Sequence, residues 1–169
     1  YNQDIIDRYN KGEMISADSI HFPDSLKYST HKLKRIVYGG GGIMPDYFIP
    51  IDTTKFTKYH RDLSNKGAII NAHYKYIDAN RNALINKYSD FDTFNKKYEV
   101  TPEMLTALVE EGKKLGVEFN EKEYNESLPL LKLQLKALVA RDLWDMNEYY
   151  HVINQTNDSV SKAIELMNA

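Results

Sequence analysis

The sequence predicts a mainly α fold: a bundle of about six helices, preceded by a small N-terminal β hairpin and an extended glycine-rich segment. Apolar residues recur at helical spacing through most of the chain after residue 55, and cap and glycine stop signals divide this part into successive helices. Short strand-like runs occur near the N-terminus. A chain of 169 residues is long enough to bury a substantial core.

The first elements are expected to be a short helix and a hairpin. Residues 1–16 carry apolar side chains at helical spacing, and Gly12 is a good helix stop. Leu26–Thr30 alternates in polarity and predicts a strand. After a polar turn at residues 31–35, Ile36–Tyr38 would return antiparallel and lead into the glycine run.

After residue 50 the start and stop signals predict consecutive helices. The expected segments are 51–67, 71–88, 89–98, 101–116, 120–126, 128–144 and 145–167, the last with a new cap at Asn157 or Asp158. Thr101 followed by Pro102 is a typical helix start. Ser127-Leu-Pro129 is expected to separate the short polar helix 120–126 from the next one.

The apolar positions predict which side of each helix is buried. Leu128–Trp144 is apolar nearly all the way round, so this helix should be central. In the helix 71–88, which Asn71 would cap, the expected buried stripe consists of Tyr74, Ile77, Leu84 and Ile85. We therefore expect two parts: residues 1–55, with the hairpin and glycine-rich segment, and residues 56–169, a C-terminal helical domain.

Composition excludes several kinds of function. The formal charge is -2, with 22 basic and 24 acidic residues interspersed, so no basic stripe suggests nucleic-acid binding. Without cysteine there is no disulfide framework and no thiolate metal site. No apolar run approaches the roughly 20 residues that span a bilayer. No cofactor is expected.

Histidine patterns do not predict a metal centre. The five histidines are scattered, and none forms a pair spaced to place two ligands on one helix face: His21, His31, His60, His73 and His151. His21 with Asp18 and Asp24 is the one local cluster of potential ligands, and a turn fixed by side-chain bonds explains it equally well. Core packing with solvated hydroxyls is favoured over an aromatic binding surface for the 13 tyrosines.

The glycine run Gly39–Gly42 has two interpretations. A phosphate cradle would need a following Gly-Lys-Ser/Thr and a helix, whereas Pro45 interrupts the position where that helix should begin. Close packing of the backbone against another part of a protein is the favoured interpretation. Asp46 would then accept hydrogen bonds from turn amides.

At this segment the chain resembles a known family. Gly40-Gly-Gly-Ile-Met-Pro-Asp46 is similar to the Gly-x-Gly-Ile-x-Pro-Asp motif that follows the catalytic core of carboxy-terminal processing (tail-specific) serine peptidases. The longer stretch from Arg35 to Asp46 resembles members from Bacteroides-type bacteria. The residues that carry the family motif are Arg35, Tyr38, Gly39, Gly40, Gly41, Gly42, Ile43, Pro45 and Asp46.

The resemblance implies a piece without catalytic residues. The family places its nucleophilic serine on a small-residue turn and its general-base lysine in a Gly-Lys-Gly-like context, and neither pattern occurs in this sequence. The chain opens at Tyr1 and looks excised from a longer protein that also carries a PDZ domain. Its partners would be that upstream core and PDZ domain, protein or peptide substrates, and a second copy in a homodimer. The parent would be periplasmic or otherwise extracytoplasmic.

The alternative is a self-contained helical protein-binding module. In that case the glycine motif is coincidental, and the chain has no peptidase connection. The capped helices could pack a core without a partner.

Overall fold

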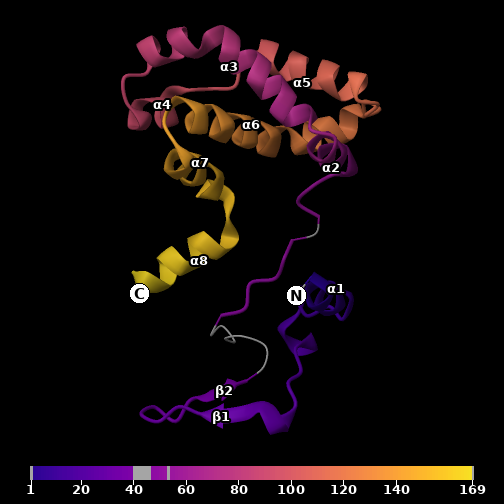
Figure 1. Cartoon of the computed structure of the whole chain (residues 1–169), viewed down its shortest axis with the longest axis vertical. Coiled ribbons are helices and arrows are strands. Elements are labelled where there is room, and N and C mark those ends of the chain that lie inside the picture. Colours follow the sequence, from indigo (N-terminus) through magenta and orange to yellow (C-terminus); the bar gives the residue numbers. More distant parts are fainter. Residues whose placement is uncertain (1, 40–46, 53, 169) are drawn as a thin grey trace. The chain divides into compact units, whose positions relative to one another are not determined.

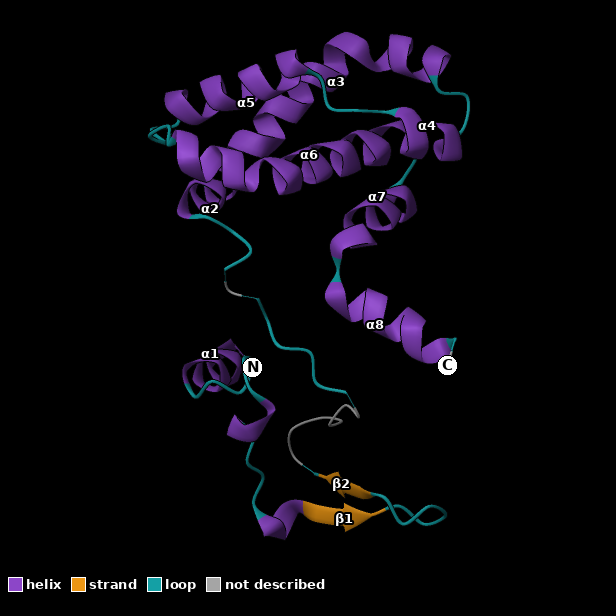
Figure 2. Ribbon diagram, turned by 180° about the vertical axis from the view of Figure 1, so that it is seen from behind, coloured by secondary structure: helices purple, strands orange, loops and turns teal. Residues whose placement is uncertain are grey.

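The computed structural model describes residues 2–39, 47–52 and 54–168, and they form two compact units, Tyr1–Thr53 and Thr54–Ala169. Eight α-helices and one two-stranded hairpin lie in the described residues, so the mainly α fold with an N-terminal hairpin is confirmed. The division between residues 53 and 54 lies next to the boundary expected between residues 55 and 56. Figures 1 and 2 show the elements of each unit.

The N-terminal unit contains little regular structure. It consists of α1 (Asn2–Asn10), two 3₁₀ turns (Ala17–Ser19 and Asp24–Leu26), β1 (Lys27–Ser29) and β2 (Ile36–Tyr38). The chain leaves α1 through Gly12, whose φ of 77° fits the expected glycine stop. The strand β1 is one residue shorter at each end than expected, and β2 has the expected bounds.

The second unit is the helical domain. Its helices are α2 (Lys58–Asn65), α3 (Ala68–Lys87), α4 (Phe91–Lys97), α5 (Pro102–Lys114), α6 (Glu121–Leu143), α7 (Met146–Ile153) and α8 (Asp158–Met167). Side-chain oxygens of residues immediately before helices accept backbone N–H bonds in the first turns, and Thr101 and Asn157 do so as the sequence predicts. These caps fix where α5 and α8 begin.

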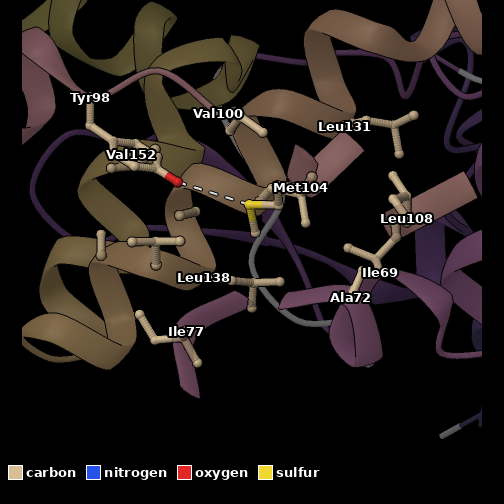
Figure 3. Packing of buried hydrophobic residues seen from close by; sticks show 14 of the residues in the cluster. Ile69, Ala72, Ile77, Tyr98, Val100, Met104, Leu108, Leu131, Leu138 and Val152 are labelled. Carbon is tan, nitrogen blue, oxygen red and sulfur yellow. Dashed lines mark hydrogen bonds between the residues drawn. The ribbon is translucent and has the colours of Figure 1, made fainter. Parts of the chain in front are cut away.

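The core of the helical domain surrounds α6. This helix packs against α2, α3 and α7, and α3 also packs along α5 (Figure 1). Residues from successive turns of α6 are fully buried, which confirms the prediction that this segment is central; they include Leu131, Leu135, Val139 and Ala140. Figure 3 shows the same core, with the Tyr98 hydroxyl donating to the sulfur of Met104 at 3.9 Å.

The break expected at Ser127-Leu-Pro129 is wrong, because α6 runs unbroken from Glu121 to Leu143 with Pro129 inside it. Proline removes one backbone N–H and crowds the preceding turn, at a cost of about 3 kcal/mol in a helix interior. Contacts on both sides of Pro129 compensate: Ser127 is bonded to Thr57, and Leu131 is fully buried. The ring itself lies on the exposed side of the helix.

The expected start of the second helix of this domain at Asn71 is also wrong. The helix α3 begins at Ala68, three residues earlier, and Asn71 donates its backbone N–H to the Gly67 carbonyl. Gly67 adopts φ 77°, so it ends α2 and starts α3 within one residue. Glycine suits this junction because a residue with a side chain would be strained at a positive φ.

The buried stripe of α3 is only partly as expected. Ile77 and Leu84 are buried, but Tyr74 and Ile85 are about half exposed. The remaining buried positions of α3 are Ala68, Ile69, Ala72 and His73. The 3.6-residue spacing of apolar residues correctly predicted a helix here, but it placed the buried stripe too close to Tyr74. The reason is that a polar residue, His73, occupies a core position. Among the described helices, none is long and apolar enough to cross a membrane.

Candidate functional site

Of the residues that carry the family-like motif, the structure describes Arg35, Tyr38 and Gly39, which lie in or next to the hairpin. Lys27 pairs with Tyr38, Tyr28 with Val37 and Ser29 with Ile36, in antiparallel register. The loop closes through two hydrogen bonds: the Thr30 N–H donates to the Arg35 carbonyl, and the Arg35 N–H donates to Thr30 Oγ1, each at 3.0 Å. These bonds place Arg35 at the start of the returning strand.

Two further contacts fix the end of the hairpin. Tyr38 stacks on Phe22, with ring centroids 4.8 Å apart. The Gly39 N–H donates to the Leu26 carbonyl at 2.8 Å, and a Cβ at Gly39 would lie 3.0 Å from the Tyr28 ring. Glycine at this position therefore allows the backbone to approach Tyr28 closely. This close approach lies within the hairpin itself, and packing of the glycine run against another part of a protein stays a prediction.

The rest of the motif, Gly40 to Asp46, lies outside the described residues. The predictions for Gly40, Gly41, Gly42, Ile43, Pro45 and Asp46 fall on this segment.

No described side chain of the N-terminal unit is fully buried. Both strands expose apolar residues: Tyr28 is 59% and Ile36 57% exposed. The other large apolar side chains exposed in this unit are Ile6, Tyr9, Ile15, Leu33, Val37, Tyr47 and Ile51. A hairpin of two three-residue strands whose side chains are mostly exposed is marginally stable by itself. This exposed apolar set is the strongest candidate for an interaction surface.

A cleft of about 920 Å³ lies on the helical domain, between α2 and the turn that joins α5 to α6. Its walls carry both charge signs; the lining residues are Lys58, Tyr59, Asp62, Lys66, Gly116, Glu118, Phe119, Asn120 and Glu123. Several of these groups are already engaged: Lys58 pairs with Asp62 at 2.5 Å, and Lys66 Nζ donates to the carbonyls of Leu115 and Gly116. The cleft could hold a polar ligand, but nothing in its lining resembles a nucleophile with a base.

Two histidines are buried in the helical domain. His73 is fully buried, and its Nε2 lies 2.7 Å from Asp142 Oδ2; His60 is 2% exposed, and its Nε2 lies 3.1 Å from Gln134 Oε1. In both rings Nδ1 has no hydrogen-bond partner. Because the facing oxygens accept, Nε2 carries the proton in each neutral ring.

Burial decides the charge of these rings. It lowers the pKa of His73, against the opposing effect of the hydrogen bond to Asp142. It also lowers the pKa of His60, against the hydrogen bond to Gln134. Neither imidazole is reachable from solvent, so neither is a candidate general base for an external substrate.

The cluster of His21, Asp18 and Asp24 is exposed and contributes to turns. Ser16 Oγ accepts the Asp18 N–H, and Asp24 begins a 3₁₀ turn. In the residues that the structure describes, no group of three or more His, Cys, Asp or Glu side chains is arranged to hold a metal ion.

A comparison with protein families matches residues 59–145 to one described as a family of unknown function (DUF8443). The chain belongs to this family. The DUF8443 match covers just over half of the chain and lies entirely within the helical domain, from Tyr59 in α2 to Asp145 before α7. No curated protein and no solved structure matches the chain.

Both buried histidines lie inside the DUF8443 match, and neither was predicted to be a core residue. A signal for each was present. His73 lies four residues from Ile69 and from Ile77, and His60 lies three residues before Leu63, all of which are buried. A histidine on an apolar stripe predicts a core position. Its polar partner, on a helix about 70 residues away, could not be predicted from spacing.

Proposed function

We propose that this chain is the non-catalytic C-terminal region of a serine endopeptidase of the carboxy-terminal processing type, which processes exported proteins near their C-termini. The hairpin unit would complete the upstream peptidase core, and the helical domain would have a structural, assembly or substrate-access role. The nucleophile and base would lie upstream. The parent would act outside the cytoplasm.

The observation that carries this proposal is the absence of fully buried side chains among the described residues of the N-terminal unit. Side chains such as Tyr28 and Ile36 gain about 25 cal/mol for each Å² of apolar area removed from water, so a covering surface would stabilise the hairpin. In the proposal this surface belongs to the peptidase core. The family-like motif includes Arg35 and Tyr38, and its glycine run directly follows β2, so the exposed hairpin and the motif adjoin in the chain.

The helical domain supports the second half of the proposal. It holds the complete buried apolar core of the described residues and has capped helices, as expected of a domain that folds around its own centre. A rigid appendage of this kind can support a catalytic domain, form a homodimer contact or restrict the approach of substrates. None of these roles requires a catalytic side chain in this chain.

A second candidate is a self-contained helical protein-binding module. The observation that favours it is that the DUF8443 match is confined to the helical domain and excludes the hairpin. In this case the cleft beside α2 would be the natural contact surface.

The endogenous protein distinguishes the two candidates. An antibody against the helical domain should recover a polypeptide much larger than 19.6 kDa, with upstream peptides containing a serine on a small-residue turn and a Gly-Lys-Gly-like lysine. The recovered protein should hydrolyse an unstructured protein substrate, whereas the isolated 169-residue chain should not. Recovery of a chain of about this size without peptidase activity would contradict the proposal and favour the binding module. Hydrolysis by the isolated chain would also contradict it.

A further inference from the structure

The first turn of α2 is held on α6 by polar side chains. Glu123 Oε2 accepts the backbone N–H of Tyr59 at 2.6 Å. Four residues further along α6, Ser127 Oγ lies 2.6 Å from Thr57 Oγ1, the group that also caps α2 through the His60 N–H. Ser127 is almost fully buried. This seam, the contact between the first turn of α2 and α6, therefore depends on hydrogen bonds that are partly buried.

His60 lies in the same seam. Its Nε2–H donates to Gln134 Oε1, and its ring meets the edge of Phe56 with centroids 5.0 Å apart. Its Nδ1 is buried without a partner. In the neutral ring this atom is an acceptor that costs the domain one lost bond. In the protonated ring it would be a charged donor with no acceptor, which is far more costly.

The charged groups around the seam are engaged by partners other than His60. On α6, Glu123 is bonded to Tyr59. On α2, Lys58 and Asp62 pair with each other at the surface, and Arg61 donates to the Phe56 carbonyl at 2.5 Å. The first turn of α3, which also packs on α2, is uncharged from Ala68 to Asn71. A proton on Nδ1 therefore meets no ready carboxylate.

His73 provides the contrast. Its ring faces the Asp142 carboxylate, so its protonated form would remain in an ion pair with α6. The partner of His60 is a neutral amide. As the pH falls, the contact of His60 with Gln134 should therefore be disrupted before the contact of His73 with Asp142.

The segment before α2 depends on the same seam. Thr57 ends it, and Lys55 Nζ donates to the Thr156 carbonyl at 2.6 Å and lies 4.0 Å from Asp158. Residues 54–57 are thus the point at which the chain enters the helical domain. Release of the first turn of α2 would remove the contacts of this entry segment at Thr57, whereas the contact of Lys55 with Thr156 would remain.

We propose that His60 is an acid-sensitive latch: protonation of its ring releases the first turn of α2 from α6 and loosens residues 54–57, while the remaining helical core stays folded. The inference does not depend on the proposed function. It assigns a regulatory device to the entrance of the helical domain.

Spin labels on α2 and α6 test the latch in the full chain. Because the sequence has no cysteine, the double variant Lys58→Cys/Asn125→Cys is labelled only at these two positions, both of which are exposed. At pH 7.5 one narrow distance distribution is expected. Below about pH 6.5 a longer, broader population should appear and, while it is minor, increase about tenfold per pH unit, since one proton is taken up. Far-UV circular dichroism should keep its helical signal.

Three variants complete the experiment. His60→Gln should remove the pH dependence, and Gln134→Glu, which gives the protonated ring a carboxylate, should keep α2 closed at pH 5. The control His31→Gln, at an exposed site in the N-terminal unit, should open like the wild type. A distance that does not change with pH, opening that persists in His60→Gln or Gln134→Glu, or helix loss in parallel with opening would overturn the proposal.

Discussion

His73 of α3 and Asp142 near the end of α6 form a partly buried contact between two helices, with Nε2 and Oδ2 2.7 Å apart. Asp142 Oδ1 also accepts from Arg141 Nε at 2.7 Å. Burial would raise the pKa of Asp142, but these hydrogen bonds outweigh it and hold the pKa below its ordinary value. One carboxylate thus fixes the orientation of a fully buried imidazole.

Removal of this carboxylate should destabilise the helical domain. Asp142→Ala leaves Nε2–H of His73 buried without its acceptor, and we expect a loss of about 1–3 kcal/mol in the free energy of unfolding. Urea titration followed by circular dichroism measures it. The matched control is Asp78→Ala, an exposed aspartate on α3, which should change stability by less than about 0.5 kcal/mol. Equal effects of the two substitutions would contradict a structural role for the pair.

The stability of the domain should fall between pH 7.5 and pH 5. His60 and His73 have pKa values lowered by burial, so the unfolded chain binds protons that the folded chain does not. Their contribution is complete above the unfolded value of about 6.5 and is lost as the pH falls from there toward the folded pKa values. The slope should be at most about 1.4 kcal/mol per pH unit for each histidine.

Urea unfolding at intervals of half a pH unit measures this slope. Asp142 has a lowered pKa and loses its contribution only as the pH falls below about 3.8, so it does not contribute in this window. Replacement of His31, which is exposed, should leave the curve unchanged. A curve that is flat from pH 7.5 to pH 5 would show that the buried rings do not titrate differently in the folded chain.

Gly112 of α5 allows α2 and α5 to approach each other. A Cβ at this position would lie 2.6 Å from Cδ2 of Leu63, which is fully buried. Gly112→Ala gains about 1 kcal/mol of helix propensity but overpacks the contact by about 1–3 kcal/mol. We therefore expect net destabilisation of up to about 2 kcal/mol. The control Glu110→Ala, exposed on the same helix, should be nearly neutral.

A double-mutant cycle tests the cause of this loss. Leu63→Ala alone should cost about 2–5 kcal/mol, because it opens a cavity. Combined with Gly112→Ala, the added methyl fills part of that cavity, so the total should be smaller than the sum by about 0.5–3 kcal/mol. Strict additivity would mean that Leu63 is not what Gly112 accommodates.

Pro129 should reduce the stability of α6. At this exposed position Pro129→Ala restores one backbone donor in a continuous helix, and we expect thermal stability to rise by the equivalent of about 1–2 kcal/mol. Differential scanning calorimetry measures the change. Destabilisation by this substitution would indicate a real helix break at residues 127–129.

The features that could be predicted from the sequence are those that depend on neighbouring residues. The cap at Thr101 and the returning strand Ile36–Tyr38 each depend on a few adjacent residues, and each was predicted with the correct position. For the last helix the sequence left Asn157 and Asp158 open as caps, and Asn157 is the residue that caps α8. The continuity of α6 across Pro129 depends on contacts such as Thr57 with Ser127, 70 residues apart. No local pattern carries that information.

The candidate site shows the same limit. The alternation around Tyr28 and Val37 predicts a hairpin whether or not a surface covers it, so exposure of both residues could not be predicted. The histidines were also undervalued, because the partners of His60 and His73 come from α6. Sequence spacing identified the helices but not the polar contacts between them.

Amide hydrogen exchange in the monomeric 169-residue chain tests most directly whether the hairpin of the N-terminal unit needs a covering surface to be stable. The account predicts weak protection in the hairpin, for example at the Thr30 and Gly39 amides, and protection at least about a thousandfold greater in the core of α6, at Leu131 and Leu135. Slow exchange throughout residues 2–39 in a monomer would contradict it, because the hairpin would then be stable without a peptidase core to cover it.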